Sequence, residues 1–181
     1  ENPSATVTGN RFKRSESFLF KFLYEMHKLL TLIFTGKLIK FGNFTCLPKE
    51  HVHRLIQKPH LWNSFSGSVT RAIDDRTFIP SRRGVRYFLP SKMSFFLLIL
   101  HSFCIISVFR KAVIIRSIVI FLVYLFLIFD NISILTLFPI IFLLIFVSII
   151  LKLSRRANLA GLDKALNNIA SIDILSKLNI R

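Results

Sequence analysis

The sequence predicts an all-α integral membrane protein, built from a short hydrophobic hairpin and one further apolar segment and flanked by amphipathic interfacial helices. Three observations indicate this class. The chain of 181 residues is 52% hydrophobic and holds 20 Phe, which is too apolar for an ordinary soluble domain. The apolar residues gather in the second half, whereas most of the 25 Lys and Arg lie in the first 92 positions, as in proteins with one face on anionic lipid. Both ends of the chain also carry amphipathic helical patterns.

Residues 1–40 are expected to form a basic tail and an amphipathic helix. In residues 15–37, large apolar side chains recur on one helical face, with Lys21, Glu25 and Lys28 opposite. Two interpretations are open: a core helix of a small domain, or a helix lying in the membrane interface. The second is favoured because little nearby sequence can build a core. The side chains predicted to insert are Phe18, Phe22, Met26, Leu29 and Ile33.

Residues 41–92 are expected to be an irregular, basic region at the membrane surface. Prolines and glycines recur through the segment and interrupt regular structure. It carries the run "IPSRRGVR" just before the apolar half. Cations at such a place pair with lipid phosphates and hold the chain on the cytoplasmic or matrix side. The predicted headgroup contacts here are Arg82, Arg83, Arg86 and Lys92.

The membrane domain is predicted in residues 93–151 and divides at the cationic run "RKAVIIR". Its first part, 93–109, has about 17 residues, the lower limit for a span, and the second is a hairpin over 117–151. If all flanking cations stay on one side, 93–109 is a shallow or re-entrant element. Three spans are the alternative, which the positive-inside rule disfavours. The cations assigned to headgroups here are Arg110, Lys111, Arg116, Lys152, Arg155 and Arg156.

The hairpin is short for two complete spans and a turn, which need about 20 residues each plus the turn. It breaks at Asp130 and Asn131 into about 13 residues before the break and about 20 after it. A wedge is therefore expected, since two helices satisfy their own backbone groups inside the bilayer. Asp130 and Asn131 form its polar tip, deep in the bilayer or at the far headgroups. The far position is favoured because a charge at the bilayer centre costs a few kcal/mol.

Residues 152–181 are predicted to form an amphipathic C-terminal helix, or two short pieces with a break near Ala170. One helical face carries apolar residues spaced three or four apart. These residues are predicted to insert into the interface: Leu159, Leu162, Leu166 and Ile169.

No catalytic residue, cofactor or metal is predicted. The chain contains no GxGxxG, GxxxxGK[ST], GxSxG, HExxH or CxxC pattern. Cys46, His51, His53 and His60 are zinc-ligand types, but their spacing matches no finger or ribbon. The positive charge would also suit nucleic acid, but the apolar half disfavours that partner.

The stretch "FRKAVIIRSIVIFLVYLFLIFDNISILTLFPIIFLLIFVSIILKL" and the tail from Asn158 follow a recognisable order. A long apolar hairpin followed by an amphipathic helix resembles the reticulon-type membrane-hairpin proteins, which shape the endoplasmic reticulum. The resemblance covers residues 109–181 and is one of arrangement. It implies a hairpin that enters the cytoplasmic leaflet as a wedge.

Two functions are open at this stage, neither of them enzymatic. One is a membrane-shaping or scaffolding protein of the endoplasmic reticulum. The other is an accessory structural subunit of a large mitochondrial inner-membrane complex, in which residues 41–92 fold against partner subunits. The expected partners are the lipid bilayer with its anionic headgroups, and other membrane-protein subunits or further copies of the chain. A transporter or membrane enzyme would need more polar residues inside the bilayer.

Overall fold

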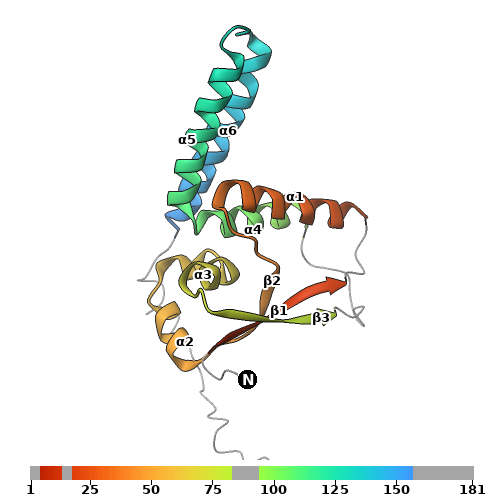
Figure 1. Cartoon of the computed structure of the whole chain (residues 1–181), viewed down its shortest axis with the longest axis vertical. Coiled ribbons are helices and arrows are strands. Elements are labelled where there is room, and N and C mark those ends of the chain that lie inside the picture. The colour runs from red at the N-terminus through yellow and green to blue at the C-terminus, as the bar shows by residue number, and fades with distance from the viewer. Residues whose placement is uncertain (1–4, 14–17, 83–93, 157–181) are drawn as a thin grey trace, which may run out of the picture.

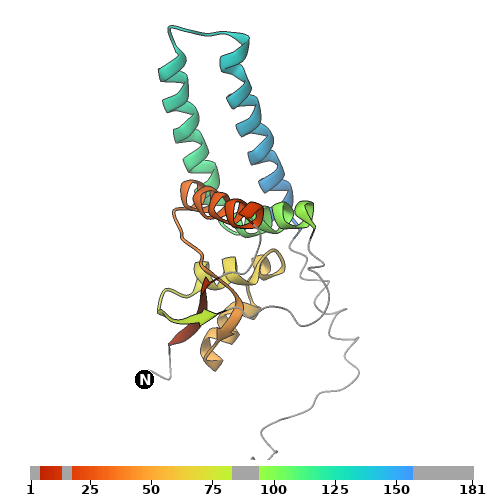
Figure 2. The ribbon, with the colours of Figure 1, turned by 90° about the vertical axis from the view of Figure 1, so that its right-hand side faces the viewer.

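The structure is a computed structural model that describes residues 5–13, 18–82 and 94–156. A helical hairpin stands away from the rest of the molecule, and a small sheet with short helices lies at the opposite end (Figure 1). Two further helices lie between these two parts and run across the base of the hairpin (Figure 2). The described residues thus form three levels: hairpin, crossing helices and sheet.

The sheet has three strands in the order β2-β1-β3: β1 (Thr6–Lys13), β2 (Phe41–Cys46) and β3 (Arg76–Arg82). β1 pairs antiparallel with β2 and parallel with β3. The expected all-α class is therefore wrong for this part of the chain. A local pattern could not reveal the sheet, because β1 pairs with residues far along the chain. The Thr8 hydroxyl, for example, donates to the Thr77 carbonyl at 3.2 Å.

Three short helices pack near the sheet: α2 (Lys49–Ile56), the 3-10 helix η1 (Pro59–Trp62) and α3 (Phe65–Ala72). The segment expected to be irregular is thus largely regular up to the end of β3. α3 begins where the Ser64 hydroxyl accepts the Gly67 N–H at 3.1 Å, a typical N-cap. The core of this part consists of three buried aliphatic residues: Leu55, Val69 and Ile73.

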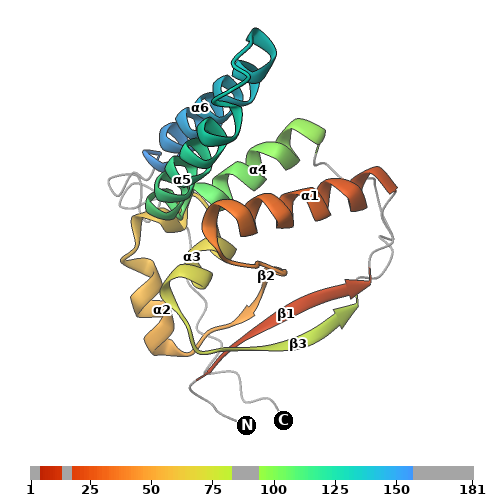
Figure 3. The same cartoon turned by 45° about the horizontal axis from the view of Figure 1, so that its top comes forward.

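The remaining helices are α1 (Phe18–Thr35), α4 (Phe95–Ser107), α5 (Arg110–Ile128) and α6 (Ile134–Ser154). α5 and α6 run antiparallel and form the hairpin, while α1 and α4 lie beside each other across its base (Figure 3). We call α1 and α4 together the platform. The sheet lies on the side of the platform opposite the hairpin (Figures 1 and 2).

The ends of these helices follow local signals in the sequence. Gly36 ends α1 with a positive φ of 71°, a conformation that glycine adopts without strain. A capping box starts α6, in which the Ser133 hydroxyl accepts the Thr136 N–H and the Thr136 hydroxyl accepts the Ser133 N–H. The break expected at Asp130 and Asn131 lies in the connection between α5 and α6.

Packing is continuous from the sheet to the hairpin. Phe41, at the start of β2, packs both on the core of the sheet part and on a second cluster that contains Ile105 of α4 and Val108, the residue after α4. A third cluster joins the platform to the hairpin, because it takes one residue each from α1, α4 and α5 and two from α6. Its members are Phe34, Ile106, Val113, Phe146 and Ile150.

Candidate membrane-binding surface

The hairpin helices are long enough to cross a membrane. α5 has 19 residues and α6 has 21, so at about 1.5 Å per residue they extend about 28 and 31 Å. The hydrocarbon core of a bilayer is about 30 Å thick. Only 17% and 11% of their apolar windows are buried inside the protein, whereas a core helix of a soluble protein would be mostly buried. Two apolar helices of the described chain are thus compatible with transmembrane segments.

The hairpin is longer than the predicted 117–151, because α5 begins at Arg110 rather than at Ser117. The sequence prediction ends the apolar helix at the cations. Arg and Lys can instead lie within a helix end and extend their charged groups toward water. With this extra length, a complete crossing fits the hairpin as well as a partial wedge does.

Exposed cations gather at one end of the hairpin. Arg110 and Lys111 begin α5, and the antiparallel course of α6 brings Lys152, Arg155 and Arg156 to the same end (Figure 1). The exposed Asp130 and Asn131 lie at the opposite end. The grouping of these cations follows the sequence prediction, while their contact with headgroups stays a prediction. Of the other predicted headgroup contacts, Arg82 ends β3, and Arg83, Arg86 and Lys92 lie outside the described residues.

Arg116 has a role that sequence reasoning missed. Its guanidinium donates to the Ile33 carbonyl at 3.1 Å, in the last turn of α1. The last carbonyls of a helix carry partial negative charge and lack partners within the helix. Arg116 therefore ties α5 to the end of α1. Its side chain stays exposed, so a headgroup can still reach it.

The outward face of α1 is apolar and the inward face carries buried threonines. Thr31 and Thr35 are buried, and their hydroxyls donate to the carbonyls of His27 and Thr31 at 2.8 and 2.6 Å. This orientation is unfavourable in water, where exposed apolar area costs about 25 cal/mol per Å². The inward face also places Phe34 in the core cluster, with Leu30 packed against it, so α1 is apolar on both faces and its position in the interface stays a prediction. The outward residues range from 38% to 84% exposed and are the five predicted to insert: Phe18, Phe22, Met26, Leu29 and Ile33.

α4 completes the platform. Its 13 residues extend about 20 Å, too short for a span, and it runs across the hairpin rather than along it (Figure 3). Large apolar residues are exposed in its first half, among them Phe95, Phe96 and Leu97. Its last three residues are buried, and the helix contacts the hairpin and α3. This geometry fits a shallow element and not a third upright span.

The sheet end carries a separate set of exposed apolar residues. Phe44, Phe78 and Ile79 are 70%, 68% and 58% exposed on β2 and β3. Phe78 and Ile79 are successive residues of β3, so their side chains point to opposite faces of the sheet and both faces expose an apolar residue. Since the platform lies between the sheet and the hairpin, these residues are on the other side from the hairpin.

Two histidines of the sheet part form hydrogen bonds within it. His51 Nδ1 lies 2.7 Å from the Thr6 hydroxyl, and His60 Nδ1 lies 2.8 Å from the Ser68 hydroxyl. Burial, together with the nearby charges of Arg71 and Lys58, lowers the pKa of His60 to about 4. Within the described residues, no three or more His, Cys, Asp or Glu side chains are grouped so that they could hold a metal ion.

Comparison with known proteins adds no family to these features. No protein-family model, curated protein or solved structure matches the chain. The likeness to membrane-hairpin proteins therefore stays a resemblance in arrangement. The C-terminal residues predicted to insert, Leu159, Leu162, Leu166 and Ile169, lie outside the described residues.

Proposed function

We propose that the protein is a non-enzymatic membrane-shaping or scaffolding protein. The α5–α6 hairpin anchors it in the bilayer, and α1 and α4 lie in the interface at the hairpin's base. The sheet remains in water on the side from which the hairpin enters. The observation that carries this proposal is the position of the platform across the hairpin, with apolar residues exposed on both of its helices (Figure 2).

The platform makes the inserted area unequal in the two leaflets. A helix about 10 Å wide that lies flat covers about 15 Å² per residue. α1 with 18 residues and α4 with 13 would then cover about 270 and 200 Å². Each upright helix covers only about 80 Å² in either leaflet. The near leaflet would therefore hold about four times as much protein area as the far leaflet. This difference favours a membrane that is convex on the near side.

The arrangement of the hairpin and the following tail, which resembles the reticulon-type proteins, supports the endoplasmic reticulum as the location. Both ends of the hairpin would face the cytoplasm, where anionic lipids attract its exposed cations.

A second candidate function is supported by a different observation. Phe44, Phe78 and Ile79 are exposed on the sheet, away from the membrane in this orientation. Such residues suit contact with another protein subunit. They therefore favour the alternative of an accessory subunit in a large membrane complex, such as one of the mitochondrial inner membrane.

One pair of variants separates the two functions. Phe18→Ser with Phe22→Ser removes two exposed aromatic residues from the platform, and Phe44→Ser with Phe78→Ser removes two similarly exposed ones from the sheet. If the protein shapes membranes, the first variant stays integrated in vesicles but forms fewer tubules than the parent, while the second forms as many.

The same variants carried on a fluorescent fusion test location in living cells. Enrichment on tubular endoplasmic reticulum, with extra tubules on overexpression, supports the first function. A mitochondrial signal would support the accessory-subunit function instead. In that case a large complex should be lost on native gels only for the sheet variant.

A further inference from the structure

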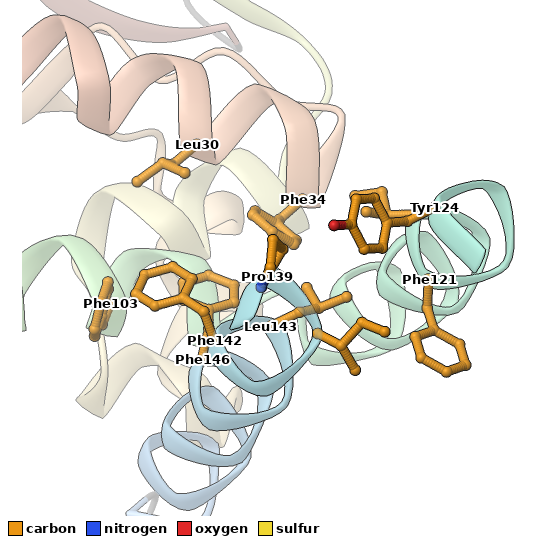
Figure 4. Close-up of a pocket in the computed structure, with 11 residues that line it drawn as sticks. Leu30, Phe34, Phe103, Phe121, Tyr124, Pro139, Phe142, Leu143 and Phe146 are labelled. Atoms are coloured by element: carbon orange, nitrogen blue, oxygen red, sulfur yellow. The ribbon is translucent and has the colours of Figure 1, made fainter. Parts of the chain in front are cut away.

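An apolar cavity of about 230 Å³ lies where the platform meets the hairpin. Residues from all four helices line it (Figure 4), among them Leu30 and Phe34 of α1 and Phe103 of α4. The remaining lining residues come from the facing sides of α5 and α6, including Ile120, Tyr124 and Ile140.

The lining is apolar and therefore favours an apolar ligand. Tyr124 is the single lining residue with a polar side-chain group, and its hydroxyl already donates to the Thr136 carbonyl at 3.0 Å. Cavities of about 150 Å³ lined by Leu, Ile and Phe stay dry and bind small apolar molecules. A cavity of 230 Å³ therefore offers space and contacts to a hydrocarbon chain and little to water.

The cavity opens on the outside of the hairpin. Pro139 and Phe142 line it and are nonetheless exposed on α6, Phe142 by 73%. Both belong to the apolar helix that is compatible with a membrane span. If the hairpin lies in a bilayer, the opening faces lipid acyl chains.

A cation lies close to the same site. Arg116 is one helical turn before Ile120, a lining residue, on neighbouring positions of the α5 surface. It uses one N–H for the Ile33 carbonyl, and an arginine has further donors in its planar fork. Arginine forks suit phosphate groups. A phospholipid has both parts, a phosphate that suits Arg116 and a hydrocarbon chain that suits the cavity.

We propose that the cavity binds one acyl chain of an anionic phospholipid, whose phosphate is held by Arg116. This inference rests on the proposed insertion of the hairpin into a membrane. The lipid would fill the gap between hairpin and platform and stabilise their crossed arrangement.

Photo-crosslinking of the full chain tests the cavity. The protein is reconstituted into phosphatidylcholine vesicles that contain phosphatidylglycerol with a diazirine on its acyl chain, and cross-linked residues are mapped by mass spectrometry. Cross-links concentrated on Ile120, Tyr124 and other lining residues are expected. Cross-links spread evenly around α5 and α6 would overturn the proposal.

Two adjacent isoleucines provide a matched pair of variants. Ile140 lines the cavity, while Ile141 is exposed on the outside. Ile140→Trp should fill the cavity and abolish cross-linking to Ile120 and Tyr124, and Ile141→Trp should leave it unchanged. Equal cross-linking in both variants would contradict a chain in the cavity.

Headgroup selection is tested by Arg116→Gln, with Lys49→Gln as the control, since Lys49 is an exposed cation of α2 in the sheet part. Unlabelled phosphatidylglycerol should compete with the probe better than phosphatidylcholine does. Arg116→Gln should reduce this preference about tenfold, the effect of one charge-assisted hydrogen bond, and Lys49→Gln should not. An unchanged preference would exclude Arg116 as the phosphate contact.

Alkaline extraction of the same vesicles separates this inference from the proposed function. Protein that resists extraction but cross-links evenly keeps the membrane function and loses the lipid site. Protein that is extracted loses both.

Discussion

Truncation of Phe146 should release the platform from the hairpin without removing the hairpin from the membrane. The Phe146 side chain lies in the cluster where α1, α4, α5 and α6 meet. Its ring centroid is 4.5 Å from that of Phe34 on α1 and 5.4 Å from that of Phe103 on α4. Phe146→Ala removes both ring contacts and leaves α5 and α6 apolar.

The size of the effect follows from these two contacts. An aromatic pair contributes about 1 kcal/mol beyond its buried area, so two pairs give about 2 kcal/mol. The loss of buried apolar area adds little to this free energy inside a bilayer, because lipid tails are as apolar as the removed ring. The equilibrium between docked and released α1 should therefore shift by about 30-fold.

Spin labels on α1 and α6 measure this equilibrium. Lys21 and Ser148 are exposed and can be replaced by labelled cysteines after Cys46→Ser and Cys104→Ser. The parent protein in vesicles should give one narrow distance distribution by pulsed electron resonance. Phe146→Ala should give a second, broad population.

Phe138→Ala is the control, because Phe138 is on the same helix, 60% exposed, and neither in the cluster nor in the cavity lining. It should leave the distribution unchanged. If Phe146→Ala and Phe138→Ala gave the same distribution as the parent, the platform would not be held by these ring contacts, and the packing argument would be wrong.

Three further predictions concern the sheet part and the hairpin tip. A Cβ at Gly67 would lie 3.0 Å from Val108 Cγ2 and 3.2 Å from the Ile105 carbonyl oxygen of α4, so Gly67→Ala should lower the free energy of unfolding in urea by about 1–3 kcal/mol. If α3 did not pack against α4, alanine in place of glycine in a helix would instead raise this free energy by about 1 kcal/mol. Burial lowers the pKa of His60 to about 4, whereas an unfolded histidine titrates near 6.5, so the unfolded state is protonated first as the pH falls. Stability should then decrease from about pH 6.5 toward pH 4, by about 1 kcal/mol at pH 5 after solvent screening, and urea curves that coincide at about pH 7 and pH 5 would contradict this. A single cysteine at Asp130 should react with an impermeant maleimide only from the side opposite to one at Lys111; reaction of both from the same side would exclude a complete crossing.

Local signals in the sequence were sufficient to predict the helices of the hairpin and the platform, apart from the start of α5. Asp130 and Asn131 interrupt the apolar run and lie in the connection between α5 and α6. Gly36 directly follows α1 and has a positive φ, so the end of this helix also follows a local signal. The residues predicted to insert from α1 are exposed, because a helical face depends only on spacing along one helix.

The sheet and the contact between Arg116 and Ile33 could not be predicted from local sequence signals. β1 is polar, and its partners β2 and β3 follow much later in the chain, so the pairing depends on the fold and not on a local period. α2 and α3 have eight residues each, too few for a clear helical pattern. Arg116 meets Ile33 only after α1 and α5 have crossed. Sequence spacing carries no information on such a crossing.

The depth of three aromatic positions tests the central claim most directly. Trp62 is the single tryptophan of the chain, so Trp62→Phe gives a background for Phe142→Trp near the middle of α6, Phe22→Trp on the platform and Phe44→Trp on the sheet. All three positions are more than half exposed. In vesicles with brominated lipids, we expect deep quenching at 142, shallow quenching at 22 and none at 44. A residue 22 as unquenched as residue 44, or an unquenched residue 142, would contradict a hairpin anchored in the bilayer with its platform in the interface.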